Sequence, residues 1–457
     1  MMSAGTRFVS WSERPLRSPL PQVRPFRALR FDPASVGDLS LVVAPPYDVI
    51  GPDRQRALAD RHPANVVRLD LPPIESGDEP DDRYRRAART LAAWRSSGTL
   101  HRDPRPALYL YEQTYRLPGS GVERRQRGLF GRLALEPFGP DGGILPHERT
   151  MAGPKEDRYR LLRATAVNTS PVVVLYTDAT GRSAEIIASI VGEPVLADVT
   201  DDDGVRHRLW AVVDDGDPAG RVGELARLAG AGPITIADGH HRYETALRYR
   251  DERRAGASGD EPQPYDDLLV LLLEAGTQEL TVLPTHRMVH GLGDHGVAAL
   301  VEGLPGLFVL RAASGPDEIR AAFSPEGWTA GGGRLGCWTR SGGWILEARP
   351  EAFGPYLPRG GETLRGLDVT TLGVALERLA GIDAAAVAAG ERLSYSHDAA
   401  EVIERVEAGA VDVAFLLEPT PVASVIAVAK VGDVMPQKST YFYPKALTGL
   451  VINPHEW

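Results

Sequence analysis

Residues 234–245 read ITIADGHHRYET, and this stretch decides the fold around the region where we expect the chemistry. The β-branched residues 234–237 predict a buried strand, and residues 242–256 predict a helix. The sequence Asp-Gly-His-His-Arg between them (residues 238–242, the DGHHR turn) brings charged and imidazole side chains to a helix N-terminus. Free backbone N–H groups and the helix dipole favour an anion there. We therefore expect a phosphate-binding turn.

Each residue of the DGHHR turn has a candidate role. Gly239 permits close backbone approach, and Arg242 can grip phosphate oxygens with its planar fork. Asp238 can accept a proton from a hydroxyl or hold Mg²⁺, and His240 and His241 can donate to developing charge or shuttle protons. Asp-Gly turns also simply cap helices. Consecutive residues that all bind anions or protons favour the functional interpretation.

Composition excludes several classes of protein. The 457 residues are 43% hydrophobic and 25% charged, which is typical of a globular protein. A net charge of -10 argues against a general nucleic-acid binder. No apolar run reaches the roughly 18 residues of a membrane span, and the N-terminus lacks the apolar core of a secretory signal. The single Cys337 cannot form an internal disulfide and is expected in a buried strand, so we expect a cytoplasmic protein.

The pattern of apolar residues and turns predicts a mixed α/β fold, with mixed sheets and flanking helices. The expected strands are 41–44, 66–71, 107–113, 127–133, 171–176, 205–213 (an edge strand), 234–237, 344–348 and 411–417. The expected helices are 53–61, 81–97, 156–164, 242–256, 297–302, 316–323, 370–380 and 399–408. Residues 267–274 fit either a buried strand or a buried helix, because periodicity does not separate the two.

The expected organisation has three parts. Residues 1–25 are a flexible N-terminal segment, residues 26–290 form a mixed α/β region that carries the DGHHR turn, and residues 291–457 form a C-terminal α/β region. Because chemistry-bearing motifs occur in both regions, we expect the C-terminal region to complete one shared site.

The sequence Pro-His-Glu-Arg-Thr at 146–150 provides a second group of candidates. His147 and Glu148 fit a general base with its orienting acid, or two metal ligands. No second histidine follows at helical spacing, so this is not a zinc-protease motif. The alternative is a polar loop in which Glu148 pairs with Arg149 or Arg158.

Residues 435–445 read MPQKSTYFYPK and provide further candidates. Lys438, Ser439 and Thr440 are expected to contact a ligand. Aromatic residues that alternate with lysines can stack a base while a lysine contacts phosphate. The alternative is a plain β-strand over 440–443, with Lys438 and Lys445 as surface caps.

Two more polar groups follow predicted strands, where α/β proteins often hold ligands. Tyr47 and Asp48 end a rigid Pro-Pro turn, and Asp48 suits either Mg²⁺ or substrate, or merely the cap of the next helix. His286 and Arg287 form a similar His-Arg pair and are candidate substrate-binding residues. Asp398, in contrast, precedes a predicted helix and is expected to be its N-cap.

Several common catalytic motifs are absent from the sequence. It has no Gly-x-Ser-x-Gly elbow, no Gly-x-Gly-x-x-Gly loop after a strand, and no pair of cysteines. Elbow-type hydrolases, Rossmann oxidoreductases and zinc fingers are therefore poor interpretations.

The segment around the DGHHR turn resembles the phosphate box of the ParB and sulfiredoxin-like fold, and most of all the box of kinases that phosphorylate free serine. In those kinases the box holds nucleotide phosphates and a nearby acid deprotonates the serine hydroxyl. His240 stands where sulfiredoxin has a cysteine, so sulfinic-acid repair is not expected.

A second resemblance spans nearly the whole chain. The motifs at 44–50, 145–150, 238–242, 285–287 and 435–445 occur in the order found in a bacterial and archaeal family, domain of unknown function 1015. This resemblance implies the fold of that family and carries little information about activity.

Together the box and the motifs imply a small-molecule kinase. ATP or ADP would bind at the DGHHR turn with bridging Mg²⁺, and the acceptor would be the hydroxyl of a small metabolite such as free serine. Asp238, His147 or Glu148 would position or deprotonate that hydroxyl, while Arg242 and Lys438 would neutralise charge. The alternative is a non-catalytic, ParB-like regulatory protein that binds a nucleotide.

Overall fold

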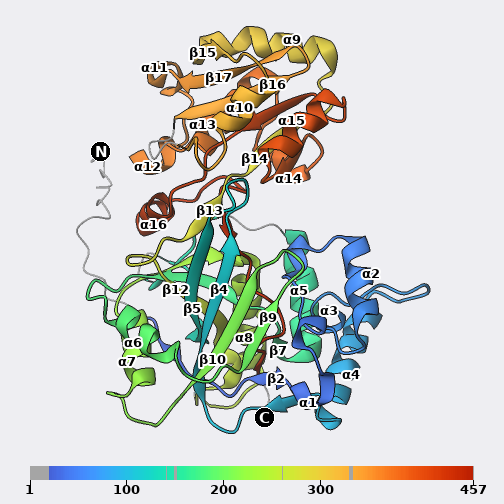
Figure 1. The fold of residues 1–457 in the computed structure, drawn as a ribbon, viewed down its shortest axis with the longest axis vertical. Helices are drawn as coiled ribbons and strands as arrows, with labels where there is room; N and C mark the ends of the chain where they lie inside the picture. Colours follow the sequence, from blue (N-terminus) through green and yellow to red (C-terminus); the bar gives the residue numbers. More distant parts are fainter. Residues whose placement is uncertain (1–19, 140–141, 149–151, 260, 329–332, 456–457) are drawn as a thin grey trace, which may run out of the picture.

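The computed structural model describes residues 20–139, 142–148, 152–259, 261–328 and 333–455. Its strands form two main sheets, which lie toward opposite ends of the long axis of the molecule (Figure 1). The predicted mixed α/β fold with flanking helices is therefore confirmed. Most of the N-terminal segment predicted over residues 1–25 lies outside the described residues, and the division of the chain at residue 290 stays a prediction. No helix in the described part of the chain is long and apolar enough to span a membrane.

The larger sheet has nine strands, which run in the order β6-β11-β8-β12-β5-β4-β10-β9, with β1 paired to β5. In chain order they are β1 (Val23–Arg24), β4 (Ala107–Arg116), β5 (Glu123–Ala134), β6 (Ile144–Leu145), β8 (Val172–Tyr176), β9 (Ala197–Thr200), β10 (Arg206–Val213), β11 (Ile234–Asp238) and β12 (Asp267–Glu274). The predicted strands 107–113 and 127–133 lie in β4 and β5, which pair as a hairpin, and residues 267–274 form a strand that is buried along its whole length.

Alternate residues of the larger sheet enter two different cores, as the period of a β-strand requires. Leu108 and Leu110 face the helices, whereas Tyr109 and Tyr111 face the core shared with the second sheet. Four helices cover the face that carries Leu108 and Leu110. They are α5 (Ala152–Thr165), α6 (Arg182–Ile190), α7 (Arg221–Ala229) and α8 (His240–Ala255).

A small N-terminal unit lies beside this sheet, with its own apolar core. It contains β2 (Leu29–Phe31), α1 (Pro33–Val36), α2 (Pro52–Arg61), α3 (Val67–Asp70), α4 (Asp82–Ser96) and β3 (Leu100–Arg102), with short 3-10 turns at Leu39–Leu41 and Tyr47–Val49. The second 3-10 turn carries two of the predicted site residues.

The second sheet has six strands, in the order β15-β17-β16-β19-β14-β18. They are β14 (His286–Val289), β15 (Phe308–Ala312), β16 (Arg334–Thr339), β17 (Gly342–Ala348), β18 (Leu393–Ser396) and β19 (Val413–Leu416). The helices of this part are α9 (Gly293–Gly303), α10 (Pro316–Ala322), α11 (Pro350–Phe353), α12 (Glu362–Arg365), α13 (Asp368–Ala380), α14 (Ala384–Ala389), α15 (Ala399–Glu407) and α16 (Val422–Lys430). Cys337 is fully buried on β16, as predicted, and burial raises the pKa of its thiol to about 12.

Three predicted elements are wrong. Residues 66–71 form helix α3 instead of a strand, because the Asn65 side chain accepts the backbone N–H of Val67 and starts a helical turn. Residues 41–44 do not form a strand: a 3-10 turn capped by Asp38 ends there, and Ala44 makes a single bridge to Thr448. Strand β10 is not an edge strand, because the short β9 pairs with its outer side.

The last part of the chain crosses from the second sheet back to the first. Strand β20 (Tyr441–Tyr443) pairs with β13 (Thr281–Leu283), and β21 (Asn453–Pro454) pairs with β7 (Val167–Asn168). Between them, Leu447, Leu450, Val451 and Ile452 are buried. Residues 435–455 are thus part of the larger core, and they bring distant side chains to the DGHHR turn.

Asn168 fixes this returning segment. Its Oδ1 accepts from Leu269 N at 3.1 Å, from Asn453 Nδ2 at 2.9 Å and from His455 Nε2 at 2.9 Å. We predict that Asn168→Ala lowers the free energy of unfolding by about 3 kcal/mol, because buried donors lose their acceptor. Urea denaturation measures this loss. The exposed control Thr200→Ala should change stability by less than about 0.5 kcal/mol, and equal effects of the two variants would contradict the prediction.

Candidate functional site

The site is built around the connection between β11 and α8. Gly239 joins them with a φ of 93°, a left-handed conformation that favours glycine. A Cβ at this position would lie 2.8 Å from Arg242 Nε, so only glycine leaves room for the guanidinium. Helix α8 begins at His240, two residues before the predicted start, and its first N–H groups lie at the predicted phosphate turn.

A cavity of about 470 Å³ opens at this turn, and we call it the first cavity. Its lining comes from the small N-terminal unit, both sheets and the returning C-terminal segment. The lining residues are Tyr47, Asp48, Val49, Glu148, Ala237, Asp238, Gly239, His240, His241, Arg242, Thr285, Ser394, Tyr395, His397, Lys438, Thr440, Tyr441 and Lys445. Its size falls in the range of about 300–1,000 Å³ that is usual for small-molecule sites.

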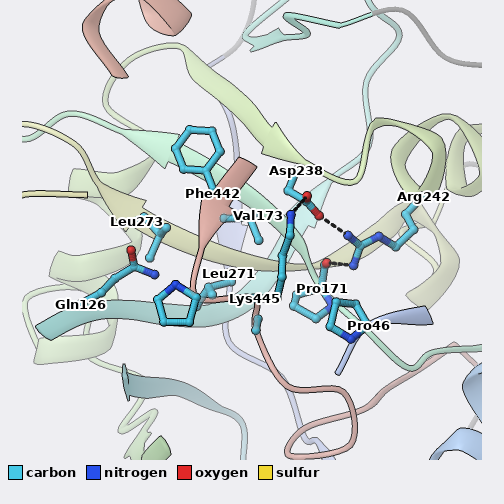
Figure 2. A pocket seen from close by; sticks show the side chains of 12 residues that line it. Pro46, Gln126, Pro171, Val173, Asp238, Arg242, Leu271, Leu273, Phe442 and Lys445 are labelled. Carbon is cyan, nitrogen blue, oxygen red and sulfur yellow. Dashed lines mark hydrogen bonds and ion pairs between the residues drawn. The ribbon is translucent and has the colours of Figure 1, made fainter. Parts of the chain in front are cut away.

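Three charged side chains in the lining of the first cavity contact one another. Figure 2 shows the Asp238 carboxylate between Lys445 and Arg242. Asp238 Oδ1 accepts from Lys445 Nζ at 2.5 Å, and Oδ2 accepts from Arg242 Nη2 at 2.5 Å. Arg242 also donates to the Pro171 carbonyl, and Lys445 lies 4.3 Å from the centre of the Tyr441 ring. We call Asp238, Arg242 and Lys445 the charged triad.

The charged triad carries a net charge of +1. Burial alone would raise the pKa of Asp238, but Lys445 and Arg242 hold it well below its usual range. Burial opposes the charge of Lys445, yet the Asp238 carboxylate raises the Lys445 pKa. Arg242 Nε is buried and has no hydrogen bond to any residue that the structure describes. An excess positive charge and an open N–H donor are what an anionic ligand requires.

Two histidines lie behind the turn. His147 Nδ1 donates to the Ile236 carbonyl at 2.6 Å, so its Nε2 accepts from the Thr440 hydroxyl at 3.1 Å. The backbone N–H of His147 donates to His240 Nε2 at 3.2 Å. Burial lowers the pKa of His147 to about 4 and that of His240 well below its ordinary value. Both rings are therefore neutral near pH 7, and they act as fixed hydrogen-bonding groups.

The loop before β20 presents Lys438 to the first cavity. Lys438 has a φ of 59°, which costs energy for a residue with a Cβ. Its N–H donates to Glu148 Oε1 at 3.3 Å, and its carbonyl accepts from Arg287 Nη2 at 3.1 Å. The Ser439 hydroxyl donates to the Pro436 carbonyl at 2.5 Å. These bonds hold the strained loop, while the Lys438 side chain stays exposed at the cavity.

Glu148 and Asp48 are the carboxylates that remain available at the first cavity. Burial raises the pKa of Glu148, and its Oε2 has no hydrogen bond to a described residue. Asp48 is exposed, and it acts electrostatically on Arg242 and Lys445 without a hydrogen bond to the described part of the chain. Glu148 is therefore a better proton acceptor than Asp238, because cations occupy both oxygens of Asp238.

The described residues contain no group of three or more His, Cys, Asp or Glu side chains that could hold a metal ion by themselves. Asp238, the predicted metal ligand, has its oxygens in ion pairs. Asp48 and Glu148 are oxygen donors of the kind that Mg²⁺ takes, usually one or two at a time together with substrate phosphates. The residues thus fit a nucleotide-borne Mg²⁺ better than a protein-only metal site.

The structure brings most of the predicted site residues together. Those that line the first cavity are Tyr47, Asp48, Glu148, Asp238, Gly239, His240, His241, Arg242, Lys438 and Thr440. Four predicted site residues lie outside its lining. His147 bonds to the lining residue Thr440, Ser439 bonds to the Pro436 carbonyl, and Arg287 bonds to the Lys438 carbonyl. His286 lines a neighbouring cavity. Arg149 and Thr150 of the 146–150 motif lie outside the described residues.

Sequence reasoning missed several lining residues. Lys445, interpreted as either a phosphate contact or a surface cap, is mostly buried and paired with Asp238. The signal for it was its place in the 435–445 motif. Tyr395 and His397 also line the cavity, although in the sequence they only precede the helix capped by Asp398. That N-cap role of Asp398 is confirmed.

Residues 23–370 match a family described as "Protein of unknown function (DUF1015)". The chain belongs to the DUF1015 family. The match covers four of the five motifs from which this membership was predicted, and the 435–445 motif lies beyond its end. For this DUF1015 protein, that last motif supplies Lys438, Thr440, Tyr441 and Lys445 to the first cavity.

Solved structures similar to this DUF1015 protein include free serine kinase in complex with AMP, at 12% identity and a TM-score of 0.34, covering 68% of this chain and 88% of the kinase. SbnI from Staphylococcus aureus with a C-terminal truncation has 11% identity and a TM-score of 0.34, covering 68% and 83%. A conserved hypothetical protein from Pyrococcus furiosus has 14% identity and a TM-score of 0.31, covering 67% and 92%. No curated protein sequence matches. These likenesses concern the general fold.

The buried neutral His147 makes stability depend on pH. Its pKa is about 4 in the folded protein and about 6.5 in an unfolded chain. The unfolded chain therefore binds more protons between these values, and stability falls as the pH drops from about 6.5 to 4. We predict that His147 accounts for about 3 kcal/mol of this loss. Between pH 6.5 and 4, the free energy of unfolding of His147→Asn should therefore fall by about 3 kcal/mol less than that of the unmodified protein. The exposed control His295→Asn corrects for losing a histidine as such; equal slopes for His147→Asn and the unmodified protein would contradict the prediction.

The charged triad predicts a stability effect for Lys445. In Lys445→Met, buried Asp238 keeps only Arg242, so we expect a loss of about 2 kcal/mol in the free energy of unfolding. Adding Asp238→Asn should recover part of that loss, because the carboxylate is removed. Chemical denaturation of both variants checks this. The exposed control Lys430→Met should stay within about 1 kcal/mol. No recovery in the double variant would argue against a direct Asp238–Lys445 pair.

Proposed function

We propose that this protein is a small-molecule kinase that transfers a phosphoryl group from ATP or ADP to the hydroxyl of a small metabolite. The observation that carries the proposal is the net positive charged triad beneath the N-terminus of α8. A helix N-terminus, a left-handed glycine and an open guanidinium N–H together suit a phosphate group. The exposed Lys438 adds a third cation at the same cavity.

The charged triad also suggests a division of roles. Arg242 and Lys445 are held by Asp238, so they offer fixed charge that needs no reorganisation when negative charge develops on the phosphoryl oxygens. Lys438 and the neutral His240 can donate further hydrogen bonds from the cavity wall. Asp238 therefore serves as the anchor of these cations in our proposal, in preference to a role as base or metal ligand.

Glu148 is the proposed general base. It lines the cavity beside Lys438, and burial raises the pKa of its carboxyl, which makes it a stronger proton acceptor than an ordinary glutamate. The acceptor oxygen forms a bond to the terminal phosphorus, and its proton passes to Glu148. The bond from that phosphorus to the bridging oxygen breaks, and the electron pair stays on the departing nucleotide. Thus ATP would leave as ADP, or ADP as AMP.

Magnesium fits the proposal as a companion of the nucleotide: when bound, it would neutralise phosphate charge, and Asp48 would supply a carboxylate oxygen to it. Free serine is the first acceptor to test, since the DGHHR turn resembles the box of free-serine kinases. The buried thiol of Cys337 is compatible with a cytoplasmic site of action.

Glu148→Gln tests the proposed chemistry. We expect phosphoryl transfer to fall by about 10²–10⁴-fold, because proton removal by a placed base contributes that much. Nucleotide affinity should change far less, since Glu148 is not one of the phosphate donors. The assay incubates the protein with Mg²⁺, ATP or ADP and a panel of hydroxy metabolites that includes serine, with phosphorus NMR as the readout and calorimetry for nucleotide binding.

The exposed Glu351→Gln variant is the matched control and should keep full activity. Nucleotide binding without any phosphorylated product across the panel would sink the kinase proposal. That outcome would instead favour the second candidate, a non-catalytic nucleotide-binding regulatory protein, in which the charged triad recognises phosphate and the Lys438 loop responds to it.

A further inference from the structure

A second cavity of about 560 Å³ adjoins the first one. It lies between the turn of the β4–β5 hairpin, at Pro118 and Gly119, and the part of the second sheet where α10 ends and α15 begins. Among its walls are Leu283, Pro284, His286, Phe323, Trp328 and His397. Nothing in the proposed phosphoryl transfer uses this space, although it is larger than the first cavity.

The two cavities share His397, which lines both. Its Nδ1 donates to the Pro284 carbonyl at 2.8 Å, and its ring lies 3.7 Å from that of Tyr441, centre to centre. The imidazole is thus held in place, while its Nε2 has no hydrogen bond to the described residues. Burial lowers the pKa of His397, so the ring is neutral at pH 7 and Nε2 can accept a hydrogen bond. His397 therefore lies at the boundary between the first cavity and the second.

The second cavity suits an apolar or aromatic group. The Trp328 indole N–H donates to the Phe323 carbonyl at 3.2 Å, so the polar atom of the ring is already satisfied. Arg320 and Asp317, whose side chains are 54% and 84% exposed, pair with each other at 2.5 Å. Besides the two histidines, the other polar side chains of the lining are Ser324, Glu326 and Asp398, and the remainder is ring and aliphatic surface. Burying such surface against a ligand removes it from water and favours binding.

His286 adds one polar feature to the second cavity. Its Nδ1 accepts from the backbone N–H of Leu417 at 3.1 Å, so Nε2 carries the proton. That Nε2 is buried without a hydrogen bond to the described residues, and burial lowers the His286 pKa to about 3. An unpaired buried donor costs energy, and a ligand carbonyl that reaches it would recover that cost.

From this arrangement we propose that the second cavity holds the far end of the phosphoryl acceptor, and that the acceptor carries an apolar or aromatic group beyond its hydroxyl. This inference rests on the proposed kinase function. A nucleotide suits the first cavity, Glu148 lies in that cavity, and an acceptor that reaches Glu148 past His397 leaves its remaining atoms in the second cavity. Free serine would leave this space empty, whereas a serine extended through an amide would fill it and present a carbonyl.

Two acceptors and two variants test the inference. L-serine and L-seryl-L-phenylalanine carry the same hydroxyl, and the dipeptide adds an amide carbonyl and a ring. We expect the dipeptide to have a kcat/KM about tenfold higher or more, mainly through a lower KM. Trp328→Ala should abolish this preference by raising the KM for the dipeptide toward the KM for serine. The control Tyr356→Ala removes an exposed aromatic ring outside the second cavity, and it should retain the preference for the dipeptide.

A binding measurement separates failure of the inference from failure of the kinase proposal. Calorimetry with the dipeptide is carried out on Glu148→Gln, alone and combined with Trp328→Ala. Binding that depends on Trp328, without transfer in the unmodified protein, would overturn the kinase function and support the cavity assignment. Transfer to both acceptors at equal kcat/KM, unaffected by Trp328→Ala, would overturn the inference and leave the kinase function standing. Neither transfer nor binding would overturn both.

Discussion

The buried contact of Asp238 with Lys445 and Arg242 is the constraint on which the rest of the site depends. One carboxylate and two cations leave water together, and such a cluster is stable only if each member is well paired. Asp238 comes from the end of β11, Arg242 from the first turn of α8, and Lys445 from the segment after β20. The cluster therefore fixes the distance between two parts of the chain about two hundred residues apart.

Hydrogen bonds from neighbouring residues support the charged triad. His147 bonds both to β11 and to Thr440, and its backbone bonds to His240. Arg287 and Glu148 hold the left-handed Lys438 backbone. Strained conformations persist only where several contacts specify them, and they concentrate at functional sites. The strained backbone at Lys438 is thus a second observation, independent of charge, that favours a functional role for this loop.

The sequence predicted those parts of the fold that depend on local patterns. The β4–β5 hairpin, β11 and helices such as α4 follow from periodicity and turn residues over ten or more positions. The strand predicted at residues 66–71 is wrong because six residues are too few to show a clear period, and the Asn65 side chain, which accepts the Val67 N–H, starts a helical turn instead. Within the site, Lys445 could not be assigned, because its partner Asp238 lies far away in sequence.

The same limit explains the fate of the other candidates. His147 and Ser439 have the right chemistry for a site, yet whether a polar side chain faces a ligand or holds the wall depends on a rotation that no local pattern encodes. His286 lies in the wall of the second cavity and Arg287 supports the Lys438 loop, because successive residues of strand β14 point to opposite sides.

The returning segment 435–455 has a consequence for anyone who would transplant this site. The strand-turn-helix unit around Gly239 looks self-contained, and it could be grafted onto another α/β scaffold as a block. Such a graft would carry Asp238 and Arg242 and would leave behind Lys445, Thr440 and Lys438, which arrive from the other end of the chain. The grafted carboxylate would then neutralise its own arginine. An isolated copy of the turn would carry no net charge, because the excess positive charge of the charged triad comes from Lys445 at the other end of the chain.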